Sequence, residues 1–109
     1  MIVELPITQE GPFFGFGTEL DGVTYRFAFR WNERISQWVL DLSDGDGALV
    51  VSGVKVVIDT PLFDRFRGRA AVPPGEVIAV DTENGGRDAD LEDLGRRVRL
   101  YYLSSDELA

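Results

Sequence analysis

Two runs of alternating apolar and polar residues, separated by a short polar segment, occupy the stretch from Gly22 to Leu42. In the first run every second residue is aromatic, namely Tyr25, Phe27, Phe29 and Trp31. In the second run the same spacing gives Trp38, Leu40 and Leu42. A period of two is typical of strands with one buried face, and aromatic pairs across strands each stabilise a hairpin by roughly 0.2–1 kcal/mol. The stretch therefore predicts a β-hairpin whose aromatic face lies in the core.

Short β-branched or aromatic runs, separated by turn residues, continue along the rest of the chain. Asp21-Gly22 predicts a two-residue hairpin turn, and Gly53 predicts a bend within a strand. A short helix of about two turns is predicted at 60–67, with Thr60 as its cap, and a polar loop at 82–95. The predicted strands cover residues 2–8 (an edge strand), 13–20 (bent or bulged at Gly15–Gly17), 25–31, 38–42, 49–58 (one strand or two), 76–81 and 97–103.

This pattern predicts an all-β fold with one domain spanning residues 1–109. About seven or eight short strands and one short helix favour a small closed or nearly closed β-barrel or roll, because closure removes exposed sheet edges. A two-sheet β-sandwich is the alternative. A hydrophobic content of 44% over 109 residues suffices for one core and not for two.

The composition restricts the function. The chain has no cysteine and no histidine, so thiolate metal sites and histidine bases are excluded. A net charge of −8 disfavours binding to nucleic acid or to an anionic membrane. No apolar run approaches the roughly 20 residues of a membrane span, and the N-terminus lacks the features of a signal peptide. We therefore expect synthesis in the cytoplasm, without membrane or free nucleic-acid partners.

Acidic clusters raise the question of a metal site. Asp41, Asp44 and Asp46 resemble a calcium loop, but the fifth ligand position would then be Ala48, and the required Gly and Glu are missing. We favour a solvated turn, and we expect no metal and no cofactor. A second acidic group could ligate a cation or contact a basic partner, although a solvated loop is favoured. It consists of Asp88, Asp90, Glu92 and Asp93.

Two groups of arginines are the basic exceptions on this acidic chain, and they have two interpretations. They form a seam complementary to an acidic neighbour, or they serve solubility alone. The first group is Arg65, Arg67 and Arg69, and the second is Arg96, Arg97 and Arg99.

Catalytic signals are weak. The nucleophile and phosphate-binding motifs GxSxG, GxxxxGKS and GxGxxG do not occur. A hydrolase with paired carboxylates stays an alternative, but no pair is singled out by an apolar neighbourhood that would raise one pKa. Phe27, Phe29 and Trp31 alternate with Arg26 and Arg30, as on a nucleic-acid stacking platform. On a strand, however, the arginines point away from the aromatic face, so we favour a core role and assign no catalytic residue.

The chain resembles the baseplate plug family of contractile-tailed phages, of the cyanophage type. The resemblance runs in order over nearly the whole length, and the block from Tyr25 to Asp44 is its most specific part. It departs from the family pattern around residues 68–76, where Pro73-Pro74 interrupts a strand. The matching segments are Glu4-Leu5-Pro6-Ile7, Leu20 to Arg26, Arg30 to Arg34, Trp38 to Asp44, Leu49 to Val56, Leu94-Gly95 and Leu100 to Tyr102.

The resemblance implies a structural protein of the virion, located in the tail baseplate, that helps to close the tube and hub region and has no catalytic activity. Its implied partners are other tail proteins of the hub, tube and wedge, in an oligomeric assembly. We expect the N-terminal strand and the 82–95 loop to make these contacts, with strand addition at an exposed edge. A free-standing β-barrel module that binds a sugar, peptide or nucleic acid is the alternative, and it predicts an exposed Trp31 or Trp38.

We interpret five residues as structural. Trp31 and Trp38 are expected to act as anchors, Asn32 to form the turn between them, and Asp41 to be a polar partner to that turn. Tyr25 belongs to the same aromatic face. No site residue is carried over from the family.

Overall fold

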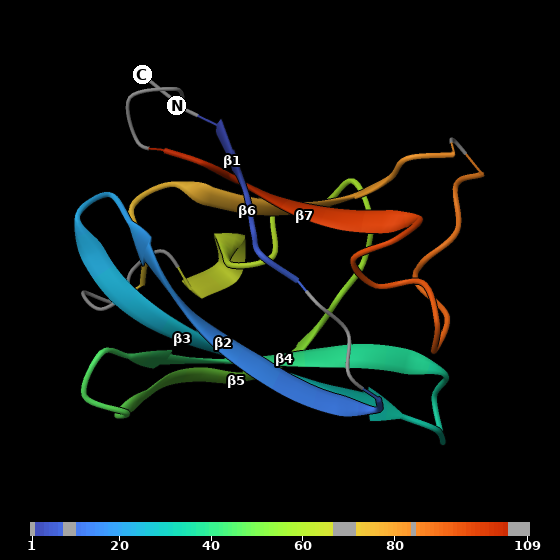
Figure 1. Cartoon of the computed structure of the whole chain (residues 1–109), viewed down its shortest axis with the longest axis horizontal. Coiled ribbons are helices and arrows are strands. Elements are labelled where there is room, and N and C mark those ends of the chain that lie inside the picture. The colour runs from blue at the N-terminus through green and yellow to red at the C-terminus, as the bar shows by residue number, and fades with distance from the viewer. Residues whose placement is uncertain (1, 8–10, 67–71, 84, 105–109) are drawn as a thin grey trace.

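The described part of the chain forms seven β-strands in two antiparallel sheets (Figure 1). The computed structural model of the protein describes residues 2–7, 11–66, 72–83 and 85–104. One sheet has the strand order β2-β3-β4-β5 and the other has the order β1-β7-β6. The strands are β1 (Ile2–Glu4), β2 (Phe13–Leu20), β3 (Val23–Asn32), β4 (Gln37–Asp44), β5 (Leu49–Lys55), β6 (Glu76–Asp81) and β7 (Val98–Leu103).

The all-β prediction is confirmed, but the described residues form no closed barrel, and the sandwich alternative fits the two sheets better. No pairing joins β1 to β2 in the described part of the chain. β5 ends at Lys55 and not at residue 58 as predicted. Among the described residues, the segment after β5 pairs with β6 only through isolated bridges, from Ile58 to Ala79 and from Pro61 to Ile78. Asp59 has a positive φ of 59° and Pro61 has no N–H to donate, so this connection cannot continue as a regular strand.

The predicted aromatic hairpin is confirmed as β3 and β4. Phe29 lies opposite Leu40, and Trp31 lies opposite Trp38. Phe27 and Phe29 are buried and their rings stack, with centroids 6.4 Å apart. The alternation read from the sequence therefore selects both the register and the buried face.

The predicted turn at Asp21-Gly22 joins β2 to β3. Leu20 pairs with Val23, and the two turn residues have φ values of 51° and 80°. A two-residue hairpin turn of this hand requires a positive φ at both positions, which Asp and Gly tolerate better than other residues.

The bulge predicted at Gly15–Gly17 is wrong, because β2 pairs with β3 in an unbroken register from Phe13 to Leu20. The close backbone approach expected there occurs at Gly15 alone. A Cβ at Gly15 would lie 2.8 Å from the carbonyl oxygen of Phe27, whereas at Gly17 the nearest atom would be 3.7 Å away. Backbone crowding therefore requires glycine at position 15 and leaves room for a side chain at position 17.

Alanine substitutions at these two glycines are expected to have opposite effects. Gly15→Ala should lower the free energy of unfolding by about 1–3 kcal/mol, because the Phe27 carbonyl must move. Gly17→Ala should raise it by about 0.5–1 kcal/mol, because glycine inside a strand loses more backbone entropy on folding than alanine. Urea unfolding of both variants measures the difference. A Gly15→Ala variant as stable as Gly17→Ala would contradict the tight contact.

The bend predicted at Gly53 is confirmed as a β-bulge in β5. Leu40 pairs with Val54 and Leu42 pairs with Val51, so three steps along β5 match two along β4. Gly53 has a φ of +74°, a conformation in which residues other than glycine are strained.

The two-turn helix predicted at 60–67 is wrong. The described part of this segment contains one turn of 3-10 helix, η1 (Asp64–Phe66), and position 67 lies outside the described residues. The N–H of Leu62 donates to the carbonyl of Val77 on β6 at 2.9 Å, so the backbone here bonds to the sheet and not within a helix. The hydroxyl of Thr60 donates to the carbonyl of Ile58 at 3.3 Å and caps no helix.

The second sheet matches the prediction closely. β6 has the predicted bounds, β7 begins one residue later than predicted, and β1 is an edge strand. β1 ends at Glu4, so the prediction of a strand continuing to residue 8 is wrong for the described residues 5–7, and Thr8 lies outside the described residues. The described residues of the 82–95 loop contain no helix or strand, apart from an isolated bridge from Leu94 to Val98.

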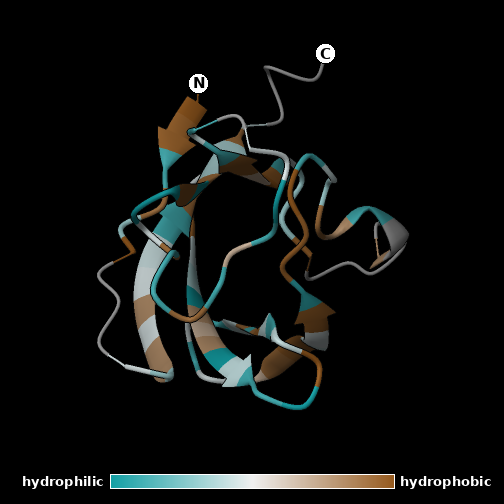
Figure 2. Ribbon diagram, turned by 90° about the vertical axis from the view of Figure 1, so that its right-hand side faces the viewer, coloured by the Kyte–Doolittle hydropathy of each residue, from teal (hydrophilic) through white to brown (hydrophobic). Residues whose placement is uncertain are grey.

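The inner faces of both sheets supply one apolar core, and hydrophobic and hydrophilic residues alternate along the strands (Figure 2). Tyr102 on β7 joins three segments at one end of it. Its hydroxyl donates to the carboxylate of Asp21 at 2.5 Å and accepts the N–H of Gly75 at 2.8 Å. Burial and the nearby carboxylate raise the pKa of Tyr102. The described residues include no helix with the length and apolarity of a membrane span.

Candidate functional site

The two tryptophans meet across the β3–β4 hairpin. Their ring centroids are 5.7 Å apart in an edge-to-face arrangement. Trp38 is completely buried, and its indole N–H donates to the carbonyl of Asp90 at 3.0 Å. Trp31 is half-buried, and its N–H donates to the carboxylate of Glu33 at 2.5 Å. Trp38 thus lies in the interior, whereas Trp31 lies at the rim of the core.

The other three residues interpreted as structural lie on the same hairpin. The side-chain oxygen of Asn32 accepts the N–H of Arg34 at 3.1 Å, which closes the turn. The carboxylate of Asp41 contacts Arg30 at 2.6 Å and accepts the N–H of Gly53 at 2.9 Å. Asp41 therefore contacts the β5 bulge and not the β3–β4 turn. Tyr25 is buried, and its pKa is raised by burial and by the charge of Asp21.

The aspartates compared with a calcium loop do not converge. Asp44 uses one oxygen to accept the N–H groups of Asp46 and Ala48, at 3.0 and 2.9 Å. This arrangement is an ordinary side-chain closure of a turn. Within the described ranges, no group of three acidic side chains is placed to hold a metal ion.

The late acidic loop is attached to the body through Asp88. One oxygen of its carboxylate accepts the side-chain amide of Gln37 at 3.1 Å, and the other accepts the N–H of Ile58 at 3.0 Å. The indole N–H of Trp38 donates to the carbonyl of Asp90, two residues further along the loop. The interpretation as a solvated loop therefore holds for the exposed Asp90 and Glu92, but not for Asp88.

A buried arginine organises the same loop. The guanidinium of Arg97 contacts the carboxylates of Asp81 at 2.7 Å and Asp93 at 2.9 Å. It also donates to the carbonyls of Arg87 at 3.0 Å and Asp88 at 2.8 Å. The side chains of Arg97 and Asp81 are only 7% and 3% exposed. We name Arg97, Asp81 and Asp93 the Arg97 cluster.

Asp81 was not among the predicted site residues, although its position in the sequence carried a signal. It follows Val77 and Ala79 at a spacing of two, and both are completely buried. A carboxylate in that series points into the core and needs a cation there.

The cluster changes the pKa values of its members. Burial tends to raise the pKa of Asp81, but hydrogen bonds from the amides of Glu83 and Arg87, together with the charge of Arg97, hold it below the ordinary 3.8. The hydrogen bond from Arg97 lowers the pKa of Asp93. That same bond is the main cause of the raised pKa of Arg97.

The lowered pKa values predict loss of stability in acid. The stabilisation from Asp81 and Asp93 is fully present above their unfolded pKa of 3.8, and is lost as the pH falls through the lower folded values. The chain has no histidine, so the melting temperature should change little from about pH 7 to 5 and fall below about pH 4. Thermal unfolding followed by circular dichroism measures this profile. Asp93→Asn should flatten the fall, and an unchanged slope would contradict the assignment.

The prediction that Arg97 belongs to a surface seam of arginines is wrong, because this residue is buried and paired inside the molecule. Arg96 and Arg99 are exposed and face Glu92 and Glu4 at 3.9 and 3.5 Å. In the other group, Arg67 and Arg69 lie outside the described residues, as does the side chain of Arg65.

The aromatic face does not form an exposed stacking platform. Phe27 and Phe29 are buried, while Arg26 and Arg30 are exposed on the opposite face of β3. The β-barrel binding module required an exposed Trp31 or Trp38, and neither tryptophan is fully exposed.

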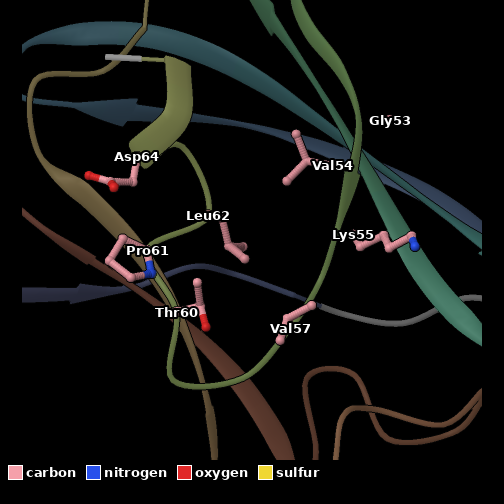
Figure 3. A pocket seen from close by; sticks show the side chains of 8 residues that line it. All are labelled: Gly53, Val54, Lys55, Val57, Thr60, Pro61, Leu62 and Asp64. Carbon is pink, nitrogen blue, oxygen red and sulfur yellow. The ribbon is translucent and has the colours of Figure 1, made fainter.

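A hollow of about 410 Å³ lies between the end of β5 and the segment before η1 (Figure 3). Aliphatic groups of Val54, Val57 and Leu62 form much of its lining, with Lys55 and Asp64 on opposite sides. Asp64 is the only carboxylate among these described lining residues. Glycoside hydrolysis needs two carboxylates across a cleft, so this hollow does not support that alternative.

The chain matches a known protein family over most of its length. The model of the family described as "Cyanophage baseplate Pam3 plug gp18" matches residues 2–106, which is nearly the whole chain. A search of curated proteins finds no match.

Proposed function

Because the chain belongs to the cyanophage baseplate plug family, we propose that it closes the tube and hub region of a contractile phage tail through contacts with other tail proteins. The resemblance predicted from the sequence motifs is confirmed. Membership places the chain in the tail baseplate of the virion, in a family of structural plugs that are not enzymes. The match over residues 2–106 is the observation that carries the proposal.

The use of the charged groups supports a structural role. Arg97, Asp81, Asp93 and Asp88 make contacts within the molecule that attach a long loop to the core. A plug must resist deformation, and a loop held by buried charged hydrogen bonds serves that purpose. We include Tyr25, Trp31, Asn32, Trp38 and Asp41 in this structural role.

The proposed partners are hub, tube and wedge proteins, within an oligomeric baseplate. We propose that β1 and the 82–95 loop contribute to these contacts. β1 is an edge strand of its sheet and exposes Ile2. The loop exposes Asp90 and Glu92. An exposed edge permits strand addition, and exposed charges influence orientation more than affinity.

Mass spectrometry of purified virions and isolated tails tests this function. We expect the chain in both, at a constant ratio to the tube protein, and immunogold labelling at the baseplate end. Tails assembled without the chain should show an open tube end in cryo-electron micrographs. Virions that never contain the chain would overturn the proposal.

A further inference from the structure

The outer edge of β2 presents unpaired backbone groups. The N–H of Trp31 donates to the carbonyl of Pro12 at 2.7 Å, and the tight turn pairs Leu20 with Val23. Hydrogen bonding alternates along an antiparallel ladder, so the even-numbered residues of β2 direct their backbone groups to β3. Those directed to the free edge are the backbone groups of Phe13, Gly15, Gly17 and Glu19. Among the described residues, no strand pairs with this edge.

This edge lacks most of the features by which proteins prevent strand addition. Short length, bulges, proline, lysine and covering segments are the usual devices. β1 has three residues, β5 has a bulge, and β6 is bridged by the segment containing Ile58 and Pro61. β2 has eight residues in unbroken register, no proline and no lysine, and Phe13 at its start is 66% exposed.

Gly17 has no explanation within the isolated chain. A Cβ there would make ordinary contacts, and its φ is not in the left-handed region. Glycine inside a strand costs stability and often marks the close approach of another backbone. The Nη1 atom of Arg26 lies 3.8 Å from the position that this Cβ would occupy, so the Arg26 side chain reaches over Gly17. Arg26 is exposed and has no ion pair with a described residue, although the chain carries a net charge of −8.

We propose that the free edge of β2 binds an extended segment of another protein, which extends the β2-β3-β4-β5 sheet and places an acidic side chain over Gly17 against Arg26. The backbone groups of the edge select an extended chain. Gly17 leaves space for the acidic side chain, and Arg26 supplies its counter-charge. The source of this segment, another tail protein, rests on the proposed function.

A second copy of the chain fits this edge less well. Antiparallel pairing of two β2 strands over nearly their full length would place Gly15 or Gly17 of the second copy beside Gly17, with no acid for Arg26. The register that places Glu19 beside Gly17 would pair only the last few residues of β2. None of these registers satisfies both the backbone edge and Arg26.

Photocrosslinking in purified tails tests the location. The photoreactive residue p-benzoylphenylalanine replaces Phe13 at the β2 edge or, as a matched control, the exposed Leu49 on β5 at the opposite edge of the same sheet. We expect the position-13 variant to crosslink to a different tail protein, at a segment that contains Asp or Glu. Crosslinking only at position 49, only to another copy of the chain, or not at all would overturn the inference. Absence of the chain itself from the tails would instead overturn the proposed function, and with it the tail partner.

Competition for incorporation into tails tests the chemistry. Arg26→Glu is expected to be incorporated at least about tenfold less than the natural chain, because charge reversal opposes an acidic partner. Arg34→Glu makes the same charge change at an exposed loop position and should compete equally. Gly17→Pro removes an edge N–H that the fold does not use, and should also be excluded. Each purified variant must unfold like the natural chain. Equal incorporation of Arg26→Glu and Arg34→Glu would overturn the inference.

Discussion

Replacement of Arg97 by methionine is expected to lower the free energy of unfolding by about 3–5 kcal/mol, because removal of one partner of a buried ion pair leaves the other uncompensated. Asp81 would keep its buried carboxylate, with the cation at 2.7 Å gone. The carbonyls of Arg87 and Asp88 would also lose their donor. Urea unfolding at neutral pH measures the loss. We expect the 82–95 loop to exchange its amide hydrogens faster in this variant.

Two further substitutions separate charge and geometry from general effects. Arg97→Lys keeps the charge but lacks the planar fork that reaches both carboxylates and both carbonyls, so its stability should be intermediate. Arg99→Met removes an exposed arginine whose carboxylate partner, Glu4, is 3.5 Å away, and should cost less than about 1 kcal/mol. If Arg97→Met were as mild as Arg99→Met, the buried cluster would not hold the loop.

The hairpins could be predicted from the sequence because their determinants are local. Alternation at a period of two identifies the buried face, and Asp21-Gly22 identifies the tight turn. The bend at Gly53 could be predicted for the same reason. Glycine alone does not distinguish a bulge from crowding, however, and at Gly15 the cause is the Phe27 carbonyl of the neighbouring strand.

The arrangement of the sheets could not be predicted, because it depends on contacts between distant segments. Thr60 and Pro61 form a good helix start by local rules. The amide of Leu62 bonds to β6 instead, and this tertiary contact overrides the local preference. The same segment pairs with β6 only through isolated bridges, so it does not join the two sheets into one.

The Arg97 cluster could be predicted only in part. Asp81 lies in phase with Val77 and Ala79, so its burial was readable from the strand pattern. The burial of its partner Arg97 could not be predicted, because Arg97 lies beside Arg96 and near Arg99 in a basic run that is typical of a solvated surface. The attachment of Asp88 to Gln37 and Ile58 joins segments far apart in the chain, and no local pattern encodes it.

Replacement of Trp38 by alanine is the second substitution with a large expected effect, a loss of about 3–5 kcal/mol. Trp38 is completely buried and packs edge-to-face against both Phe14 and Trp31, with ring centroids 5.5 and 5.7 Å away. Alanine would leave a cavity where the hairpin meets the late loop. It would also leave the carbonyl of Asp90 without its indole donor. Chemical unfolding followed by circular dichroism avoids reliance on the removed fluorophore.

Conservative changes at both tryptophans divide this loss between its causes. Trp38→Phe keeps most of the apolar volume and removes the hydrogen bond to Asp90, so about 0.5–1.5 kcal/mol of the loss should come from that bond, with the remainder from packing. Trp31→Ala, at the half-buried rim, should cost clearly less than Trp38→Ala, because less apolar surface returns to water. Equal losses of stability for the two alanine variants would mean that both rings stabilise the hairpin equally. The burial of Trp38 and its hydrogen bond to Asp90 would then add nothing to the contact between the first sheet and the 82–95 loop.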